Sequence, residues 1–307
     1  MLFVRGKRPR LVTIGDLTLD VVVQPAAAVE AGTDVPASVR FRAGGSAANT
    51  ARAFARLGGA ATFVGAVGTD RVGVLAARTL RAEGVTARVV QKRGSTARLI
   101  VLLSRGGERS FLTDRGVADL LSPRALRASW VAGADALHLP AYSLLNPPLC
   151  VTAFEAARMA HAAGALVSID LASRRPLLEI GAEKARVVIG QHHPDLLFAN
   201  RDEAVALVGS RKLGQLLDLA PIVVIKEGAA GCTVLWGEEE MLVKARPLKS
   251  TDTTGAGDAF DAGFLYSLIS TDRAPATLRR LDLRHAAYDG QKAAAAFIRG
   301  PRAELAL

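Results

Sequence analysis

The residues whose types and spacing best suit catalysis form a short glycine-rich loop, Asp252-Thr-Thr-Gly-Ala-Gly-Asp258. An amphipathic helix is predicted to begin near Asp258, because apolar residues recur every four positions after it; these are Phe260, Phe264 and Leu268. At a helix N-terminus the unpaired amide hydrogens and the dipole favour an anion, and small residues let a phosphate approach the backbone. Gly255, Ala256 and Gly257 are therefore predicted to form an anion site.

Asp258 admits two interpretations. As an N-cap it would only complete the first turn of the helix, a position at which aspartate is favoured. As a carboxylate beside an anion site it could accept the proton of a hydroxyl group that attacks phosphorus, which is the base that phosphoryl transfer uses. A simple cap does not need the threonine and glycine residues that precede Asp258, so the loop favours the second interpretation.

A second glycine motif, Gly44-Gly45, precedes a helix predicted over 47–57, with Asn49 in its first turns. A double glycine is usually a tight turn, but it can also bring a ligand hydroxyl close to backbone amides, and the Asn49 amide offers a donor and an acceptor. Asp16, after the predicted strand Leu11–Gly15, is by itself best interpreted as a turn residue that ends the strand. The residues alone leave the two alternatives for the double glycine open.

In order and spacing, Ala43–Ala51 and Asp252–Phe260 resemble the two signatures of the ribokinase-like (PfkB-type) family of carbohydrate and nucleoside kinases. The resemblance extends over about Leu11 to Gly300. It implies that Asp258 is the catalytic base and that the 255–257 amides stabilise the transferred phosphoryl group. It also implies a sugar-binding set, which consists of Asp16, Gly44, Gly45 and Asn49.

Two further segments resemble nucleotide and metal elements of the same family. Asn200 and Glu203 match its Asn-x-x-Glu element and would place Mg²⁺ through water, since Mg²⁺ dehydrates reluctantly; the same spacing is that of a helix capping box. The segment Ile222–Gly231 resembles the nucleotide-binding strand and turn, with Lys226, Gly228 and Gly231 near the phosphates or ribose. The resemblance also implies that Asp252 and Thr254 could hold a monovalent cation such as K⁺. A Walker-type loop and a Rossmann fingerprint are both missing from the sequence, so ATP must be held otherwise.

Short apolar runs alternate with helical patterns along the chain, which predicts a mainly parallel sheet covered on both faces. The resemblance implies a ribokinase-like three-layer α/β/α fold, with residues 1–307 as one domain. Segments near 17–24 and 36–42 are predicted to form a small β-sheet lid over the site, although a decorative hairpin is the simpler alternative. The predicted buried strands are Leu11–Gly15, Ala61–Val67, Leu99–Leu103, Ala136–Leu139, Ala165–Ile169, Leu196–Ala199 and Ile222–Ile225.

Composition narrows the class of protein. A hydrophobic content of 50% with 22% charged residues in 307 residues excludes a disordered chain, and no apolar stretch approaches the roughly 18 residues of a membrane span. The net charge of +10 comes from scattered basic residues, without the long runs or interleaved aromatics typical of nucleic-acid binding. Cys150 and Cys232 lack metal-ligand spacing, so a reduced, cytoplasmic protein is expected.

The predicted function is ATP- and Mg²⁺-dependent phosphorylation of a hydroxymethyl group of a sugar. A nucleoside kinase of the same fold and a catalytically silent sugar- or nucleoside-binding regulator are the alternatives. Arg98 and Arg115 could face an acidic substrate, although structural roles are favoured for both. Exposed strand edges of the predicted lid would allow a homodimer.

Overall fold

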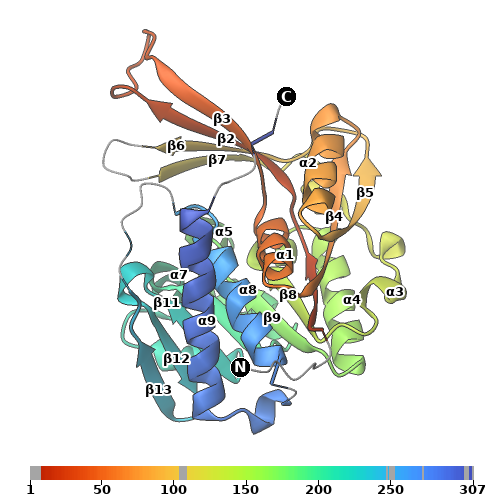
Figure 1. The fold of residues 1–307 in the computed structure, drawn as a ribbon, viewed down its shortest axis with the longest axis vertical. Helices are drawn as coiled ribbons and strands as arrows, with labels where there is room; N and C mark the ends of the chain where they lie inside the picture. The colour runs from red at the N-terminus through yellow and green to blue at the C-terminus, as the bar shows by residue number, and fades with distance from the viewer. Residues whose placement is uncertain are drawn as a thin grey trace.

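Strands buried on both faces form the centre of the molecule (Figure 1). The computed structural model describes residues 8–103, 109–246, 248, 253–271, 273–300 and 304–305. In its main sheet the strand order is β13-β12-β11-β10-β9-β8-β1-β4-β5. Neighbouring strands from β11 to β5 run parallel, whereas β12 and β13 are antiparallel at one edge. The bounds are β1 Arg10–Ile14, β4 Ala60–Gly68, β5 Thr86–Lys92, β8 Ala136–Pro140, β9 Leu166–Asp170, β10 Leu196–Asn200, β11 Ile222–Lys226, β12 Cys232–Trp236 and β13 Glu239–Val243.

Successive side chains of these strands enter two separate cores, because a strand points alternate residues to opposite faces. On β1, Leu11 lies in one core and Val12 in the other. The first core is covered by α1 (Ser46–Arg56), α2 (Arg71–Ala82), α8 (Ala256–Ile269) and α9 (Arg280–Arg299). The second is covered by α4 (Leu149–Ala162), α5 (Arg174–Ile180), α6 (Ala182–Gly190) and α7 (Arg201–Val208), with the short α3 (Ala128–Val131) at its margin. The predicted three-layer α/β/α fold is confirmed.

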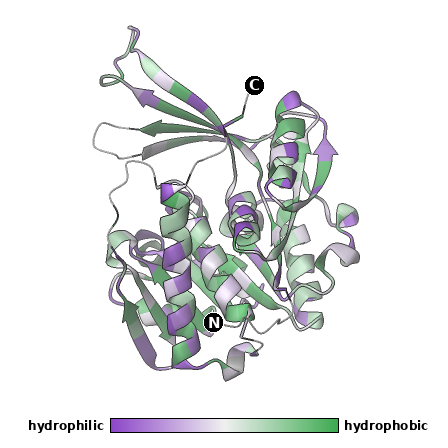
Figure 2. Ribbon diagram, in the orientation of Figure 1, coloured by the Kyte–Doolittle hydropathy of each residue, from purple (hydrophilic) through white to green (hydrophobic). Residues whose placement is uncertain are grey.

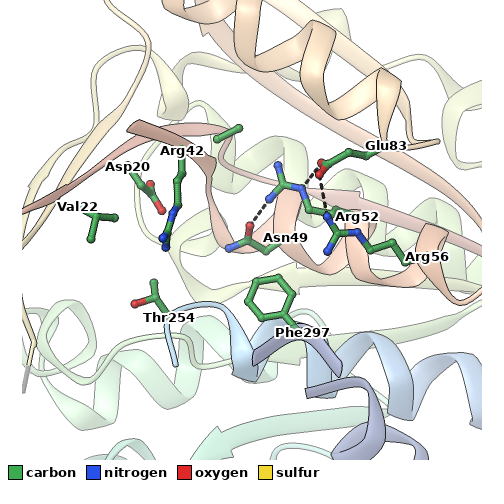
Figure 3. A pocket seen from close by; sticks show the side chains of 10 residues that line it. Asp20, Val22, Arg42, Asn49, Arg52, Arg56, Glu83, Thr254 and Phe297 are labelled. Atoms are coloured by element: carbon green, nitrogen blue, oxygen red, sulfur yellow. Dashed lines mark hydrogen bonds and ion pairs between the residues drawn. The ribbon is translucent and has the colours of Figure 1, made fainter. Parts of the chain in front are cut away.

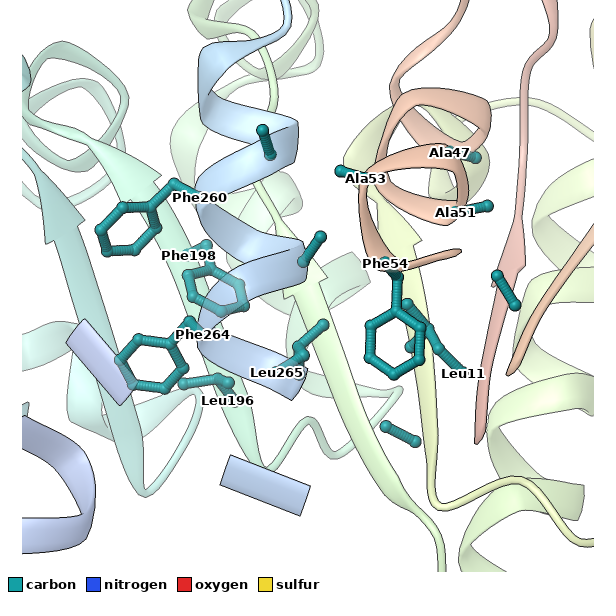
Figure 4. Packing of buried hydrophobic residues seen from close by; sticks show 14 of the residues in the cluster. Leu11, Ala47, Ala51, Ala53, Phe54, Leu196, Phe198, Phe260, Phe264 and Leu265 are labelled. Carbon is teal, nitrogen blue, oxygen red and sulfur yellow. The ribbon is translucent and has the colours of Figure 1, made fainter. Parts of the chain in front are cut away.

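Aromatic packing fixes α8 on the sheet. The ring of Phe198, on β10, meets the rings of Phe260 and Phe264, on α8, edge to face, with centroids 6.4 and 5.4 Å apart (Figure 4). Phe54 of α1 is also fully buried in this core. Edge-to-face pairs of this kind add about 0.5–1.5 kcal/mol beyond the area they bury. The N-termini of α8 and α1 are thereby held above the same end of the sheet.

A second, smaller sheet projects from one end of the molecule (Figure 1). Its order is β3-β2-β6-β7, with β2 at Thr18–Pro25, β3 at Ala37–Gly44, β6 at Arg98–Leu103 and β7 at Arg109–Asp114. The predicted pair of strands is present as β2 and β3, whose register sets Asp20 opposite Arg42. The expectation for Leu99–Leu103 was wrong: this segment belongs to the small sheet, not to the main one. Only one face of β6 is buried there, where Val101 and Leu103 pack on Val22.

Strand β1 lies between β4 and β8. The chain adds β4 and β5 on one side of β1 and the later strands, from β8 on, on its other side, so the strand order switches at β1. In parallel α/β sheets, ligands bind outside the carboxyl ends of the strands near such a switch point. At this edge β9, β10 and β11 end in Asp170, Asn200 and Lys226, and Asp16 follows β1 by two residues. Polar residues thus collect here although most of each strand is apolar (Figure 2). Among the helices of the described residues, none combines the length and apolar character that a membrane-spanning segment requires.

Candidate active site

A cavity of about 1890 Å³ lies between this edge of the main sheet, the small sheet and the first turns of α1 and α8. Single-ligand pockets commonly have about 300–1,000 Å³, so the cavity has room for two substrates side by side. Most of the predicted site residues line it; they are Asp16, Gly45, Asn49, Asn200, Glu203, Lys226, Gly228, Gly231, Thr254, Gly255, Ala256, Gly257 and Asp258. Gly44 does not line it, and Asp252 lies outside the described residues.

Asp258 is the third residue of α8, not its cap. The helix begins at Ala256, and its N-cap is Gly255 in the left-handed conformation, with φ +82°, which glycine adopts without steric cost. The Asp258 carboxylate instead accepts hydrogen bonds from Ser46 Oγ at 2.7 Å and Asn49 Nδ2 at 2.9 Å. The capping interpretation is therefore wrong, and the carboxylate is held inside the cavity by the first turn of α1.

Burial raises the pKa of Asp258 to about 6. The Ser46 and Asn49 donors oppose the rise because they stabilise the ionised form, whereas the nearby carboxylate of Asp170 adds to it. A carboxylate with a pKa near 6 is mostly ionised at neutral pH, yet it binds a proton more readily than an exposed aspartate. These are the properties of a general base.

The amides of the glycine-rich loop differ in their availability. The Ala256 N–H donates to the Thr253 carbonyl at 3.0 Å, so this amide is already engaged within the loop. Among the residues that the structure describes, the Gly255 and Gly257 N–H groups have no hydrogen-bond partner, and both residues line the cavity. The predicted three-amide anion site is reduced to these two amides and the helix dipole behind them.

One end of the cavity is lined by carboxylates; we call it the acidic end and define it by Asp16, Asp20, Asp258 and the cation Arg115. Asp16 is buried, and its Oδ2 lies 3.1 Å from Arg115 Nη1. Arg115 Nη2 also binds Asp119 at 2.6 Å, which places the guanidinium between two carboxylates. Its positive charge is thus compensated before any substrate enters.

The sequence interpretation missed Asp20 and Ser46. Asp20 is buried, accepts a hydrogen bond from Thr18 Oγ1 at 2.5 Å, and has a pKa that burial raises to about 6 despite that bond. Alternation along the extended chain could have found it, because residues 16, 18 and 20 share one face. No pattern around Ser46 distinguishes it from an ordinary residue at a helix start.

The two glycines before α1 serve packing. A methyl group on Gly44 would lie 2.1 Å from Asp20 Oδ2, so the absence of a side chain makes room for that carboxylate. Gly45 has φ +98°, and a methyl group there would lie 2.4 Å from the carbonyl oxygen of Asp16. Both glycines let β3 and the turn into α1 approach the acidic residues closely.

Lys226 lies beneath the first turn of α8. Its Nζ is 3.0 Å from Asp170 Oδ1 and 3.0 Å from Asp261 Oδ1. Burial disfavours the charge, but Asp170 and Asp261 raise the pKa of Lys226 above its ordinary value. A methyl group on Gly257 would come within 3.4 Å of Nζ, so a permanently charged ammonium lies close behind the predicted anion site.

Asn200 and Glu203 form the capping box that the sequence allowed. Asn200 Oδ1 accepts from the Glu203 N–H at 2.9 Å, and Glu203 Oε2 accepts from the Asn200 N–H at 2.8 Å. Burial and, after it, Asp170 raise the pKa of Glu203 to about 7. Repulsion between Asp170 and Glu203 is only partly offset by Lys226, and a hydrated divalent cation fits this donor set. In the described residues, no group of three or more His, Cys, Asp or Glu side chains could hold a metal directly.

Basic residues line the cavity beside β13 and the middle of α9; we call this region the basic end and define it by Lys244, Arg246 and Lys292. The turn after β11 lies there. Gly228 has φ +58° and open space at its Cα, whereas a methyl group on Gly231 would lie 2.1 Å from the Val243 carbonyl oxygen. Lys244, Arg246 and Lys292 are exposed. The cavity therefore has an acidic, mostly buried end and a basic, open end.

A fold of this kind with a carboxylate beside a helix N-terminus defines a sugar or nucleoside kinase, and comparison with known proteins gives the family. The model of the pfkB family carbohydrate kinases matches residues 8–305. The chain belongs to this family and is an ATP-dependent carbohydrate kinase. The enzyme interpretation thus prevails over the silent regulator.

Two curated relatives illustrate the range of substrates. Probable fructokinase-4 of Arabidopsis thaliana is 31% identical over 280 residues, which cover 88% of this chain and 85% of that protein. The ATP-dependent ribose-1-phosphate kinase of Halopiger xanaduensis is 32% identical over 268 residues, covering 85% of each chain. One of these names a neutral sugar and the other a sugar phosphate.

Solved structures show the same fold. The adenosine kinase from Sinorhizobium meliloti superposes with a TM-score of 0.83 at 27% identity, over 97% of this chain and 96% of that one. The fructokinase from Vibrio cholerae, solved with fructose, ADP and a calcium ion, superposes with a TM-score of 0.77 at 25% identity, over 94% and 92%. The chain therefore shares its fold with sugar and nucleoside kinases.

Proposed function

We propose that this kinase transfers the γ-phosphoryl group of ATP to a hydroxymethyl group of a neutral sugar, with Asp258 as general base. The observation that carries the proposal is the Asp258 carboxylate, held in the cavity by Ser46 and Asn49 beside the unpartnered amides of Gly255 and Gly257. Phosphoryl transfer requires positioning, charge stabilisation and a base for the nucleophile. These three requirements meet within one turn of α8.

In the proposed step, the hydroxymethyl oxygen attacks the γ-phosphorus while its proton passes to the Asp258 carboxylate. The new P–O bond forms as the bond between the γ-phosphorus and the bridging oxygen breaks, and ADP leaves. The Gly255 and Gly257 amides, with Lys226 behind them, stabilise the negative charge on the transferred group. Proton release from Asp258 to solvent restores the enzyme.

ATP is proposed to lie at the basic end, with its phosphates directed toward α8. Gly228 and Gly231 shape the turn beside it, and Lys244 and Arg246 offer positive charge to a polyphosphate. Asn200 and Glu203 would hold Mg²⁺ through its waters, and Mg²⁺, when bound, neutralises phosphate charge. For a monovalent cation, Thr254 lines the cavity while its proposed partner Asp252 lies outside the described residues.

The acceptor is proposed to bind at the acidic end and to be uncharged. Asp16 and Asp20 can accept hydrogen bonds from sugar hydroxyls, which makes a missing hydroxyl costly. Arg115 is compensated by Asp16 and Asp119, and Arg98 pairs with Asp70 at 3.7 Å outside the cavity lining. Arg42 and Arg52 act on Asp20 from outside this lining, so an anionic acceptor would meet the carboxylates of Asp16, Asp20 and Asp258 inside the cavity.

A nucleoside is the second candidate acceptor. Phe111 and Leu112 of β7 are 50% and 57% exposed and line the cavity together with Leu99 and Tyr142. An apolar wall with aromatic rings suits a nucleobase as well as the carbon face of a sugar.

The same exposed side chains, at the edge of the small sheet, favour our proposal that two copies pair through this sheet. Light scattering of the purified chain distinguishes a dimer from a monomer.

ADP release measured across an acceptor panel tests the proposed function. Fructose, ribose, adenosine and ribose-1-phosphate represent a neutral ketose, a neutral aldose, a nucleoside and an anionic sugar. We expect the highest kcat/KM with a neutral sugar and the lowest with the sugar phosphate. Preference for the sugar phosphate would reject the neutral-acceptor assignment, and preference for adenosine would select the second candidate.

A further inference from the structure

A polar network extends from the catalytic carboxylate through α1 to the residue that ends α2. Arg52 and Arg56 of α1 contact Glu83, and Arg52 also contacts Asn49, as the dashed lines show (Figure 3). The cavity beside this network has about 40 Å³, which holds only a few water molecules. This volume is far below that of a ligand pocket, about 300–1,000 Å³. The polar residues that line the cavity contact one another.

Arg52 determines which way the Asn49 amide faces. It is buried, with 5% exposure, and its Nη1 donates to Asn49 Oδ1 at 2.5 Å. The other end of the amide, Nδ2, donates to Asp258 Oδ2 at 2.9 Å. A flipped amide would set its NH₂ against the guanidinium, which has only donors, and its carbonyl oxygen against the carboxylate, which has only acceptors. The Arg52 guanidinium thus allows a single orientation of the Asn49 amide.

Glu83 holds Arg52 in place. Its Oε2 binds Arg52 Nε, while its Oε1 accepts from Arg56 Nη2 at 2.9 Å. Arg56 contacts the same carboxylate from the same helix, but its side chain is 41% exposed and it does not contact Asn49. The two arginines therefore share a partner and differ in their connection to the active site.

We propose that Arg52, anchored by Glu83, is a positioning residue that orients the Asn49 amide and thereby holds the Asp258 carboxylate in place for proton transfer. The inference rests on the proposed role of Asp258 as base. It adds a residue that reaches the catalytic carboxylate through Asn49 and that lies outside both glycine motifs.

A double-mutant cycle tests the connection. Arg52→Met removes the donor at similar length, and Glu83 retains Arg56 as partner. We expect kcat to fall about 10- to 100-fold, as for a small misplacement of a catalytic group, with the KM for ATP unchanged. In the Asn49→Ala background the same substitution should cause no further loss, because a residue that acts through Asn49 is coupled to it. Arg56→Met, the matched control, should leave kcat within about twofold.

An equal loss from Arg52→Met in both backgrounds, or an equal loss from Arg56→Met, would overturn the proposal. If Arg52→Met fails to fold, Arg52→Lys takes its place in the cycle, and coupling to Asn49 is again required. A crystal structure of the Arg52 variant gives a readout without substrate: the Asn49 amide should be flipped or displaced from Asp258. An unchanged contact between Asn49 and Asp258 would overturn the proposed role of Arg52. Inactivity of the unmodified enzyme on every acceptor would reject the proposed function instead, and the crystal structure would still test whether Arg52 orients Asn49.

Discussion

The acidic and basic ends of the cavity differ in how their charges are held. At the acidic end, Asp16 and Asp20 are buried, and Arg115 is fixed between two carboxylates. At the basic end, Lys244 and Arg246 are exposed on the segment after β13. Buried, hydrogen-bonded groups discriminate strongly between ligands, whereas exposed charges attract a polyanion with little geometric demand. In the arrangement that we propose, specificity for the acceptor and affinity for the nucleotide are therefore built by different physical means.

Asp258 belongs to the acidic end and is the proposed base, so its loss should have the largest effect of any single change. Asp258→Asn keeps the shape and the donors around it but removes the base, and we expect kcat to fall about 10²–10⁴-fold. ADP affinity, measured by calorimetry, should stay close to that of the unmodified enzyme. Turnover near the original rate would break the assignment. Asp289→Asn, on α9 outside the cavity lining, controls for a generic loss of an acidic residue.

Asp16→Asn should affect the acceptor alone. A hydrogen bond to a charged group contributes about 1.5–3 kcal/mol, so the KM for the sugar should rise about 10- to 100-fold while the KM for ATP does not change. Asp119→Asn is the matched control, because Asp119 binds the same Arg115 without lining the cavity. Similar sugar KM values for the two variants would show that the charge on Arg115, and not the Asp16 carboxylate, governs acceptor binding.

The pH profile should report the base. Asp258 must be ionised to accept a proton, and burial raises its pKa to about 6. We therefore expect kcat/KM to fall about tenfold per pH unit below about pH 6. Asn49→Ala removes a donor that lowers this pKa, so the acid limb should move to higher pH. An acid limb that stays in place, or moves to lower pH, would contradict the assignment; Asp170 and Lys226 are the other charged groups acting on Asp258.

Arg246→Gln should have the smallest effect and should be confined to the nucleotide. Exposed charge pairs contribute about 0–1 kcal/mol, so the KM for ATP should rise only severalfold, and the rise should shrink as salt screens the charge. Arg78→Gln, on the exposed face of α2, controls for the change in net charge. A rise in the sugar KM instead would contradict the assignment of ATP and the acceptor to separate ends of the cavity.

The local elements of the site could be predicted from the sequence. The glycine-rich loop before Phe260 indicates a helix start, and the capping-box spacing of Asn200 and Glu203 is realised in the structure. Alternating apolar runs predicted most strands of the main sheet. Such features follow from interactions between residues a few positions apart, which periodicity and turn chemistry encode directly.

Predictions that depended on partners far along the chain were less complete. Leu99–Leu103 is apolar enough for a central strand, but β6 pairs with β2 and belongs to the small sheet. A structural role was favoured for Arg115, but the sequence did not identify its partner Asp16, 99 positions away in the chain. Apolar content and charge do not specify which distant segment a residue will meet.

By itself, the sequence determined the residues to which we assign the chemistry, a carboxylate at position 258 with small residues before it. It also determined strands and helices in an order that yields a parallel sheet. The tertiary structure decided how that carboxylate is used. Ser46 and Asn49, 212 and 209 positions from Asp258, donate to it because α1 and α8 pack side by side over one end of the sheet. Burial there changes its pKa and Arg52 sets the amide beside it, since desolvation and hydrogen-bond direction exist only once distant segments are packed together.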